Sequence, residues 1–291
     1  MGFKGIFPAL VTPFDELGKF HVNAMAEIIE MNIEKGVHGF YVGGSTGESY
    51  LLSPEERKTV LEAVMKIVDG RVDVIANIGM FSTVQSIELA KHADSVGVSA
   101  ISAVPPFYFK FCIEEYVEYY NNLVEETNAP LIIYNVPALS GIHFSRQDIE
   151  RMFQNDKIIG LKHTSYDLFQ MQKIMEENPD KTVFIGHDEI FLSAYAAGAR
   201  AAIGSTFNFM SEKFIRMEQL FQERKLEEAL HIQGEVNDVV EVLSEIGVFK
   251  GVKEALRLQG IDAGTCRKPF LPLKRAQIEK LYQVLERTGC L

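Results

Sequence analysis

The sequence predicts an α/β protein: a (β/α)8 barrel, the TIM barrel, followed by a C-terminal extension of three helices. Three observations predict it. Eight short runs are apolar throughout, segments with helical periodicity lie between them, and a Gly-x-x-small motif precedes several of the runs. The 291 residues are enough for one barrel and an appendage, so we expect the barrel over residues 1–224 and the extension over residues 225–291.

The eight runs are predicted to be strands because none of them alternates between apolar and polar residues. Strands of a parallel sheet that is covered on both faces have this uniform character. An open, doubly wound sheet would give the same alternation of strands and helices, but eight units is the usual number for barrel closure. The expected strands are Ile6 to Val11, Gly39 to Val42, Val72 to Ile78, Ala100 to Val104, Leu131 to Val136, Ile158 to Leu161, Val183 to Ile185 and Ala201 to Ile203.

The segments between the strands carry single apolar stripes at helical spacing. One helix has a clear predicted start, in which Ser53 caps the helix, Pro54 occupies the first turn and Glu56 completes a capping box; Gly70 is its expected end. The motifs that begin at Gly36, Gly97 and Gly198 suit the left-handed residue that closes a helix before the next strand. Beyond the last strand, helices are expected over Leu226 to Ser244, Val248 to Leu258 and Arg275 to Arg287.

Composition excludes several classes of function. The formal net charge of -11 would repel a phosphate backbone, so we expect no nucleic-acid partner. Cys112, Cys266 and Cys290 show neither disulfide nor zinc-site spacing, which favours a reducing cytoplasm. No apolar stretch reaches about 18 residues, and the first apolar run begins at Gly5, so we expect no membrane span and no signal peptide.

Polar residues collect where the predicted strands end, which is where active sites of such barrels lie. Lys162 follows a run that should be buried, and burial lowers the pKa of an amine and favours the neutral nucleophile. A lysine at the rim that is paired with a carboxylate would fit the position equally well. Tyr134 ends the preceding strand and could relay a proton beside Lys162, or simply pack there.

The loop from Gly43 to Glu48 offers backbone N–H groups and the hydroxyls of Ser45 and Thr46, which suit a carboxylate or phosphate, although turn geometry also explains its glycines. His187, Asp188 and Glu189 could suggest a metal cluster. Neighbouring residues on a strand alternate faces, however, and no second group has ligand spacing, so we predict no metal.

Three segments carry a specific resemblance: Gly43 to Glu48, Tyr134 to Gly141, and Gly160 to Thr164. With them, the chain from Leu10 to Phe270 resembles, in order and spacing, the N-acetylneuraminate lyase branch of the dihydrodipicolinate synthase superfamily. The resemblance implies a class I aldolase without a cofactor that cleaves a sialic acid to pyruvate and N-acetylmannosamine.

The resemblance also implies roles for individual residues. Lys162 would form the Schiff base, Tyr134 would relay the proton, and Ser45 and Thr46 would hold the carboxylate derived from pyruvate. Tyr108 matches a tyrosine that family members contribute from a neighbouring subunit, which implies a homotetramer. The rest of the sugar would be held by Thr164, Gly186, Asp188, Glu189 and Ser205, with Phe249 as a further contact.

Other functions remain open from the sequence. Dihydrodipicolinate synthase binds a second carboxylate with an arginine after its Tyr-Asn-Val-Pro segment, but Ala138, Leu139 and Ser140 stand here and supply no cation. An aldolase for another 2-keto-3-deoxy sugar acid is a further alternative. A non-catalytic barrel that acts as a sensor or scaffold would be expected to lose Lys162 or Tyr134.

Overall fold

A computed structural model describes residues 2–291, and within them all eight expected strands form one parallel sheet in the order β1-β8-β7-β6-β5-β4-β3-β2. The first strand is shorter than predicted, because Ala9 to Val11 leave the ladder and retain a single bridge to β2. The sixth is longer and includes Lys162 and His163. The strands are β1 Gly5–Pro8, β2 Gly39–Val42, β3 Asp73–Asn77, β4 Ala100–Ala103, β5 Leu131–Asn135, β6 Ile158–His163, β7 Thr182–Ile185 and β8 Ala201–Gly204.

The sheet curves into a barrel whose last seam, between β1 and β2, is held by few hydrogen bonds. Ala9 and Tyr41 form an isolated parallel bridge, and the Leu10 N–H donates to the Tyr41 carbonyl at 2.9 Å. At the start of the two strands, the His38 N–H donates to the Ile6 carbonyl at 2.9 Å. This seam excludes the open, doubly wound alternative.

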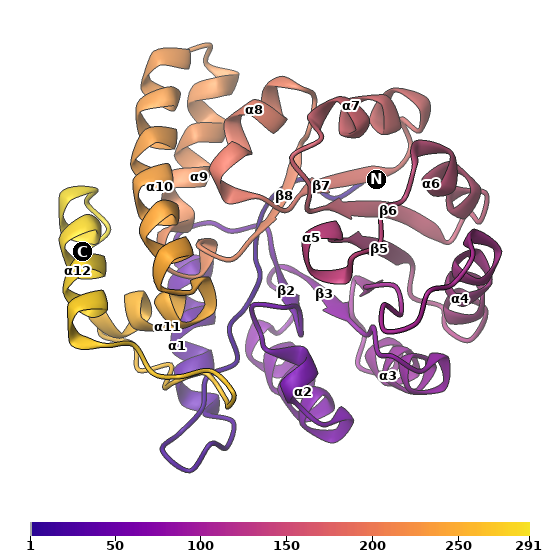
Figure 1. The fold of residues 1–291 in the computed structure, drawn as a ribbon, viewed down its shortest axis with the longest axis horizontal. Coiled ribbons are helices and arrows are strands. Elements are labelled where there is room, and N and C mark those ends of the chain that lie inside the picture. The colour runs from indigo at the N-terminus through magenta and orange to yellow at the C-terminus, as the bar shows by residue number, and fades with distance from the viewer. Residues whose placement is uncertain (1) are drawn as a thin grey trace.

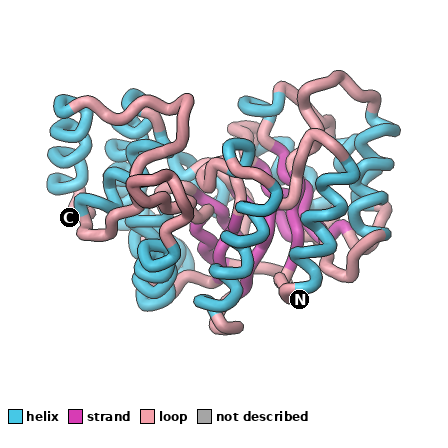
Figure 2. Tube along the Cα trace, turned by 90° about the horizontal axis from the view of Figure 1, so that it is seen from below, coloured by secondary structure: helices cyan, strands magenta, loops and turns pink. Residues whose placement is uncertain are grey.

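Helices surround the strands, as Figures 1 and 2 show. The predicted capping box is present: the Ser53 N–H donates to Glu56 at 2.8 Å and the Glu56 N–H donates to Ser53 at 3.2 Å. The helix ends earlier than predicted, at Val68, because Asp69 already takes a left-handed conformation. The barrel helices are α1 Val22–Glu34, α2 Pro54–Val68, α3 Thr83–Ser95, α4 Ile113–Glu125, α5 Pro137–Ser140, α6 Arg146–Phe153, α7 Leu168–Glu177, α8 Phe191–Ala196 and α9 Phe207–Gln222, with 3-10 turns at Ser49–Leu51 and Asp188–Ile190.

The C-terminal helices are α10 Leu226–Ile246, α11 Val248–Leu258 and α12 Arg275–Arg287. They lie together on the side of the barrel at α9 and α1 (Figure 1). The N-terminal half of α10 packs beside α8, where the side chain of Gln233 accepts from the Leu192 N–H at 2.9 Å. No helix within residues 2–291 is long and apolar enough to cross a membrane.

The inside of the barrel is filled by side chains and forms a floor for the site above it. Phe7, Tyr41, Ile132 and Phe184 belong to one buried apolar cluster in this interior. Layers of bulky residues are usual inside eight-stranded barrels and leave no channel through them. Any ligand must therefore be held at the carboxyl ends of the strands.

Candidate active site

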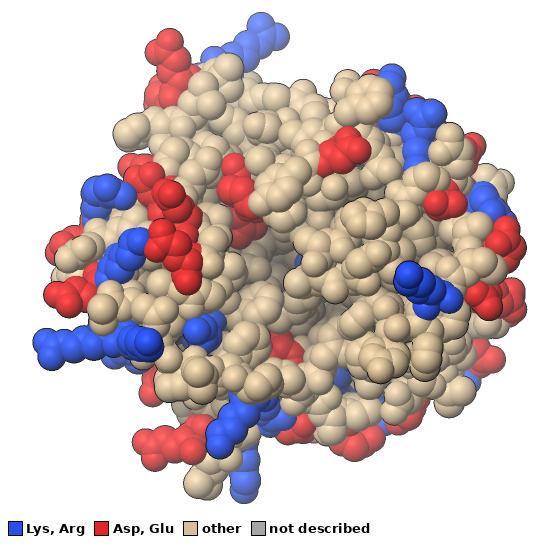
Figure 3. All heavy atoms as spheres, in the orientation of Figure 1, with Lys and Arg blue, Asp and Glu red and all other residues tan. Residues whose placement is uncertain are grey.

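A cavity of about 310 Å³ opens at the carboxyl ends of the strands. The space-filling view is hollowed near the middle of the helix ring (Figure 3). The cavity brings together nine of the ten residues predicted for the site, from β2, β5, β6, β7 and β8 and the segments that follow them; these nine are Ser45, Thr46, Tyr134, Lys162, Thr164, Gly186, Asp188, Glu189 and Ser205.

Lys162 lies on β6 directly opposite Tyr134 of β5 in the parallel register. Only 4% of the lysine is exposed, and its Nζ lies 4.0 Å from the centroid of the Tyr134 ring and 4.2 Å from that of Tyr41. Burial lowers the pKa of Lys162, while the Tyr134 phenol and the Asp188 carboxylate act in the opposite direction. None of the ion pairs among residues 2–291 includes this amine, which disfavours the paired-lysine alternative.

The Tyr134 hydroxyl lies 3.5 Å from the Ser45 hydroxyl, which connects the phenol to the loop after β2. Tyr41 meets the Tyr134 ring edge to face at 5.9 Å and donates its own hydroxyl to Ser102 at 3.1 Å. The pKa of Tyr41 is raised well above its usual range, mainly by burial. Tyr41 is thus a neutral aromatic wall for Lys162, and sequence reasoning missed it because an apolar strand does not reveal which residues face inward.

The loop from Gly43 to Glu48 is held at both ends. The Asn77 amide donates to the Gly43 carbonyl at 2.7 Å, and the Thr12 hydroxyl donates to the Gly47 carbonyl at 2.7 Å. The Thr46 hydroxyl of the loop lies 2.7 Å from the hydroxyl of Ser205, which follows β8. The Ser45 and Thr46 hydroxyls therefore border the cavity on a fixed backbone, as a carboxylate site requires.

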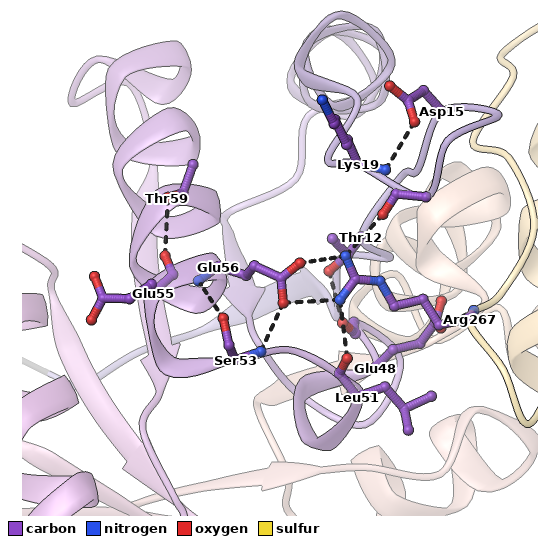
Figure 4. A network of polar contacts seen from close by, with 12 residues as sticks. Thr12, Asp15, Lys19, Glu48, Leu51, Ser53, Glu55, Glu56, Thr59 and Arg267 are labelled. Atoms are coloured by element: carbon purple, nitrogen blue, oxygen red, sulfur yellow. Dashed lines mark hydrogen bonds and ion pairs between the residues drawn. The ribbon is translucent and has the colours of Figure 1, made fainter.

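Glu48 ends this loop in a left-handed conformation with a φ of 58°. Its buried carboxylate forms an ion pair of 2.7 Å with Lys253 of α11 and accepts from the Arg267 N–H at 2.7 Å. Figure 4 shows Arg267 reaching across to Glu56 and Leu51 beside Glu48. The C-terminal extension is thereby joined to the loop that borders the cavity.

Asp188 is turned toward the start of α9. One of its carboxylate oxygens accepts from the Thr206 N–H at 2.9 Å and from the Thr206 hydroxyl at 2.7 Å. Burial raises the pKa of Asp188 to about 6, although the two Thr206 hydrogen bonds oppose the rise. A Cβ on Gly204 would lie 2.2 Å from this carboxylate, which explains the glycine there.

Thr164 and Gly186 fit together in a similar way, because a Cβ on Gly186 would lie 2.0 Å from the Thr164 hydroxyl. Within residues 2–291 that hydroxyl is buried without a hydrogen-bond partner. Gly186 is therefore needed to give the Thr164 side chain its place beside the cavity.

Glu189 lines the same cavity and is held by two neighbouring aromatic side chains. One of its oxygens accepts from the Tyr166 hydroxyl at 2.5 Å and lies 3.0 Å from His187 Nδ1. Burial would raise the pKa of Glu189, but the hydrogen bonds from His187 and Tyr166 outweigh it and lower the pKa to about 2. Within residues 2–291, no three His, Cys, Asp or Glu side chains converge as metal ligands.

Tyr108 is the one predicted site residue that lies outside the cavity of its own chain. It is 76% exposed and packs edge to face against Phe109, with ring centroids 5.1 Å apart. Phe249 does line the cavity. Sequence reasoning did not assign the other lining residues to the site, because their positions depend on how the loops and the extension fold back. These residues are Val136, Ala138, Leu139, Tyr166, His187, Ile203, Thr206, Val240, Leu243, Ser244 and Val248.

The arrangement brings a buried amine together with a phenol, fixed hydroxyls and two carboxylates, and these groups suit imine chemistry on a hydroxylated oxo acid. Comparison with known proteins agrees. The sequence model of the Dihydrodipicolinate synthetase family matches residues 2–288 of this chain. The N-acetylneuraminate lyase of Fusobacterium nucleatum is 40% identical over 277 residues, which cover 95% of this chain and 96% of that protein.

Two solved structures have the same fold over nearly the whole chain. CdNal from Clostridium difficile in complex with mannosamine superposes with a TM-score of 0.96 at 35% identity, covering 99% of this chain and 100% of that one. The Fusobacterium nucleatum N-acetylneuraminate lyase complexed with pyruvate superposes with a TM-score of 0.93 at 38% identity, covering 98% and 97%.

Proposed function

The chain belongs to the dihydrodipicolinate synthetase family, and from this premise we propose that it cleaves N-acetylneuraminate reversibly to pyruvate and N-acetylmannosamine through a Schiff base on Lys162. It is a carbon–carbon lyase of the sialic acid aldolase type. One observation carries the proposed mechanism: the buried Lys162 amine has no ion-pair partner within residues 2–291 and borders the cavity beside Tyr134.

The reaction begins at the C2 ketone of the open-chain sugar. The neutral Lys162 amine attacks C2, and loss of water from the carbinolamine gives an iminium ion. Burial supports this step because it lowers the pKa of Lys162. Ser45 and Thr46 hold the adjacent carboxylate with hydroxyl and backbone donors, so the ketone is presented to the amine in one orientation.

The iminium then acts as the electron sink for cleavage. The Tyr134 hydroxyl relays the proton of the C4 hydroxyl to the substrate carboxylate, the C3–C4 bond breaks, and its electron pair forms an enamine. N-acetylmannosamine is released as the aldehyde. The proton returns to C3, and water hydrolyses the imine to free pyruvate and Lys162.

The remaining polar groups suit the sugar's hydroxyls and N-acetyl side. Asp188 and Glu189 supply acceptors, while Thr164 and Ser205 supply short hydroxyls at the same cavity. Gly186 keeps the Thr164 side chain in place, and Phe249 adds an apolar wall.

The cavity argues against the condensation catalysed by dihydrodipicolinate synthase. Among residues 2–291, Lys162 is the only lysine or arginine that lines the cavity. The lining therefore supplies no second cation to bind the carboxylate of an aldehyde substrate. Asp188 and Glu189 would instead repel such a group. A non-catalytic barrel is also disfavoured, because Lys162 and Tyr134 are both present and adjacent.

We further propose a homotetramer in the cytoplasm. Tyr108 lies with Phe81, Phe109 and Phe111 in an exposed aromatic cluster, and exposed patches of this kind mark protein interfaces. Packing of two copies there would carry Tyr108 toward the partner's cavity. The three cysteines are free, which suits a reducing compartment.

The substrate is tested by two assays on the same protein. Release of pyruvate from N-acetylneuraminate is compared with condensation of pyruvate and aspartate semialdehyde. We expect turnover in the first assay and none above background in the second. Turnover in the second assay alone would contradict the proposed substrate.

A further inference from the structure

Two side chains at the mouth of the cavity hold the same oxygen of Glu189. Tyr166 follows β6, His187 follows β7, and their rings stack at 4.2 Å between centroids with 18° between the planes. The Tyr166 hydroxyl donates to Glu189 Oε1 at 2.5 Å, and His187 Nδ1 lies 3.0 Å from that atom. Because the rings stack and share one acceptor, Tyr166, His187 and Glu189 form one connected unit.

The unit fixes both the orientation and the charge of Glu189. Because both donors take Oε1, Oε2 is the oxygen left to accept from a hydroxyl in the cavity. The lowered pKa of Glu189, about 2, keeps the carboxylate ionised at neutral pH, so it only accepts hydrogen bonds. A group of this kind favours a ligand rich in hydroxyls.

The unit lies far closer to solvent than the chemistry does. Tyr166 is 65% exposed, whereas Lys162 is 4% exposed at the cavity floor. A ligand whose carboxylate and ketone lie at Lys162 would present its distal hydroxyls near the mouth. Contacts there are made equally in the ground state and the transition state, so their loss raises KM more than it lowers kcat.

We propose that Tyr166 and His187 are positioning residues that set selectivity for a long polyhydroxy substrate by holding Glu189 against its distal hydroxyls. The proposal rests on the proposed function, because it takes the sugar aldehyde as the group that reaches Glu189. It assigns specificity to two side chains that do not touch the reacting atoms.

The test uses Tyr166→Phe and His187→Phe, each of which removes a donor and keeps an aromatic ring in the stack. KM for N-acetylneuraminate and for N-acetylmannosamine should rise roughly three- to tenfold, as expected for loss of one hydrogen bond, with kcat within about twofold. KM for pyruvate in the synthetic direction should stay unchanged. The ratio of kcat/KM for N-acetylmannosamine to that for D-glyceraldehyde should fall by the same factor.

Tyr282→Phe is the matched control, because the Tyr282 hydroxyl donates to Glu286 at 3.1 Å within α12, away from the cavity. It should leave every constant unchanged. Equal rises in KM for pyruvate and for N-acetylmannosamine would indicate general loosening and overturn the proposal, as would unchanged constants in both variants. Failure of the unmodified chain to cleave N-acetylneuraminate would instead contradict the proposed function itself.

Discussion

Lys162 at the floor of the cavity and Lys253 in α11 are both buried lysines, with 4% and 2% of their surface exposed. Both amines lie over aromatic rings, Lys162 at 4.0 Å from the Tyr134 centroid and Lys253 at 4.3 Å from that of Phe14. Burial is the largest cause of a lowered pKa in each. The two differ in one respect: Lys253 forms an ion pair with Glu48 at 2.7 Å, and Lys162 has none within residues 2–291.

The difference teaches that burial by itself does not make a lysine a nucleophile. The Glu48 carboxylate favours the ammonium form of Lys253, and an ammonium group cannot attack a ketone. The ion pair joins the extension to the Gly43–Glu48 loop. Among the residues that the structure describes, Lys162 has no such partner, and it borders a cavity. We therefore expect the same residue type to be structural in one region and reactive in the other.

Removal of the Lys162 amine should have the largest effect on turnover and should distinguish Lys162 from Lys253 most clearly. Lys162→Met should lower turnover of N-acetylneuraminate at least about 10⁴-fold, because no imine can form. Its thermal midpoint should be unchanged or higher, since an unpaired buried amine contributes no ion pair to lose. Turnover and thermal unfolding of the same preparation check both statements, and retained turnover would contradict the role of this amine.

Tyr134→Phe should separate imine formation from proton transfer. We expect turnover to fall roughly 10²- to 10⁴-fold, because the phenol acts on the proton of the C4 hydroxyl. Trapping of pyruvate on Lys162 should still occur. Parallel measurement of turnover and adduct mass checks the prediction, and undiminished turnover would remove Tyr134 from the mechanism.

Lys253→Met should affect stability rather than chemistry. It leaves Glu48 as an unpaired buried carboxylate, which should cost about 3–5 kcal/mol in the free energy of unfolding. The double variant with Glu48→Gln should recover part of that loss, since the charge left behind is removed. Urea unfolding of the single and double variants measures the effect; equal stability of Lys253→Met and the parent would show that the pair contributes little.

The smallest effect concerns Asp188, whose folded pKa of about 6 lies above the ordinary value of 3.8. Between these values the folded chain keeps a proton that the unfolded chain loses. This contribution is therefore fully present below about pH 4 and is lost as the pH rises through 6. Asp188→Asn cannot titrate, so relative to the parent it should gain about 1–3 kcal/mol between pH 4 and 7 in urea unfolding. A constant difference across this range would contradict the raised pKa.

The strands and the place of Lys162 could be predicted from the sequence, because local patterns of residues specify both. Uniformly apolar runs predicted the strands, and their ends predicted Lys162 and Tyr134 as neighbours. The partner of Lys253 could not be predicted, since Glu48 is distant in sequence and meets it only when α11 folds against the loop. The same applies to Tyr41, whose inward face depends on barrel closure, and to Tyr166, whose contact with Glu189 joins two separate loops.

The most direct test of the contrast between the two lysines is reduction with borohydride in the presence of pyruvate, followed by peptide mass mapping. A reduced imine should add a lactyl-type group to the peptide that contains Lys162 and leave the peptide that contains Lys253 unmodified. An adduct on Lys253 or on another lysine, or no adduct at all, would contradict the assignment of Lys162 as the nucleophile.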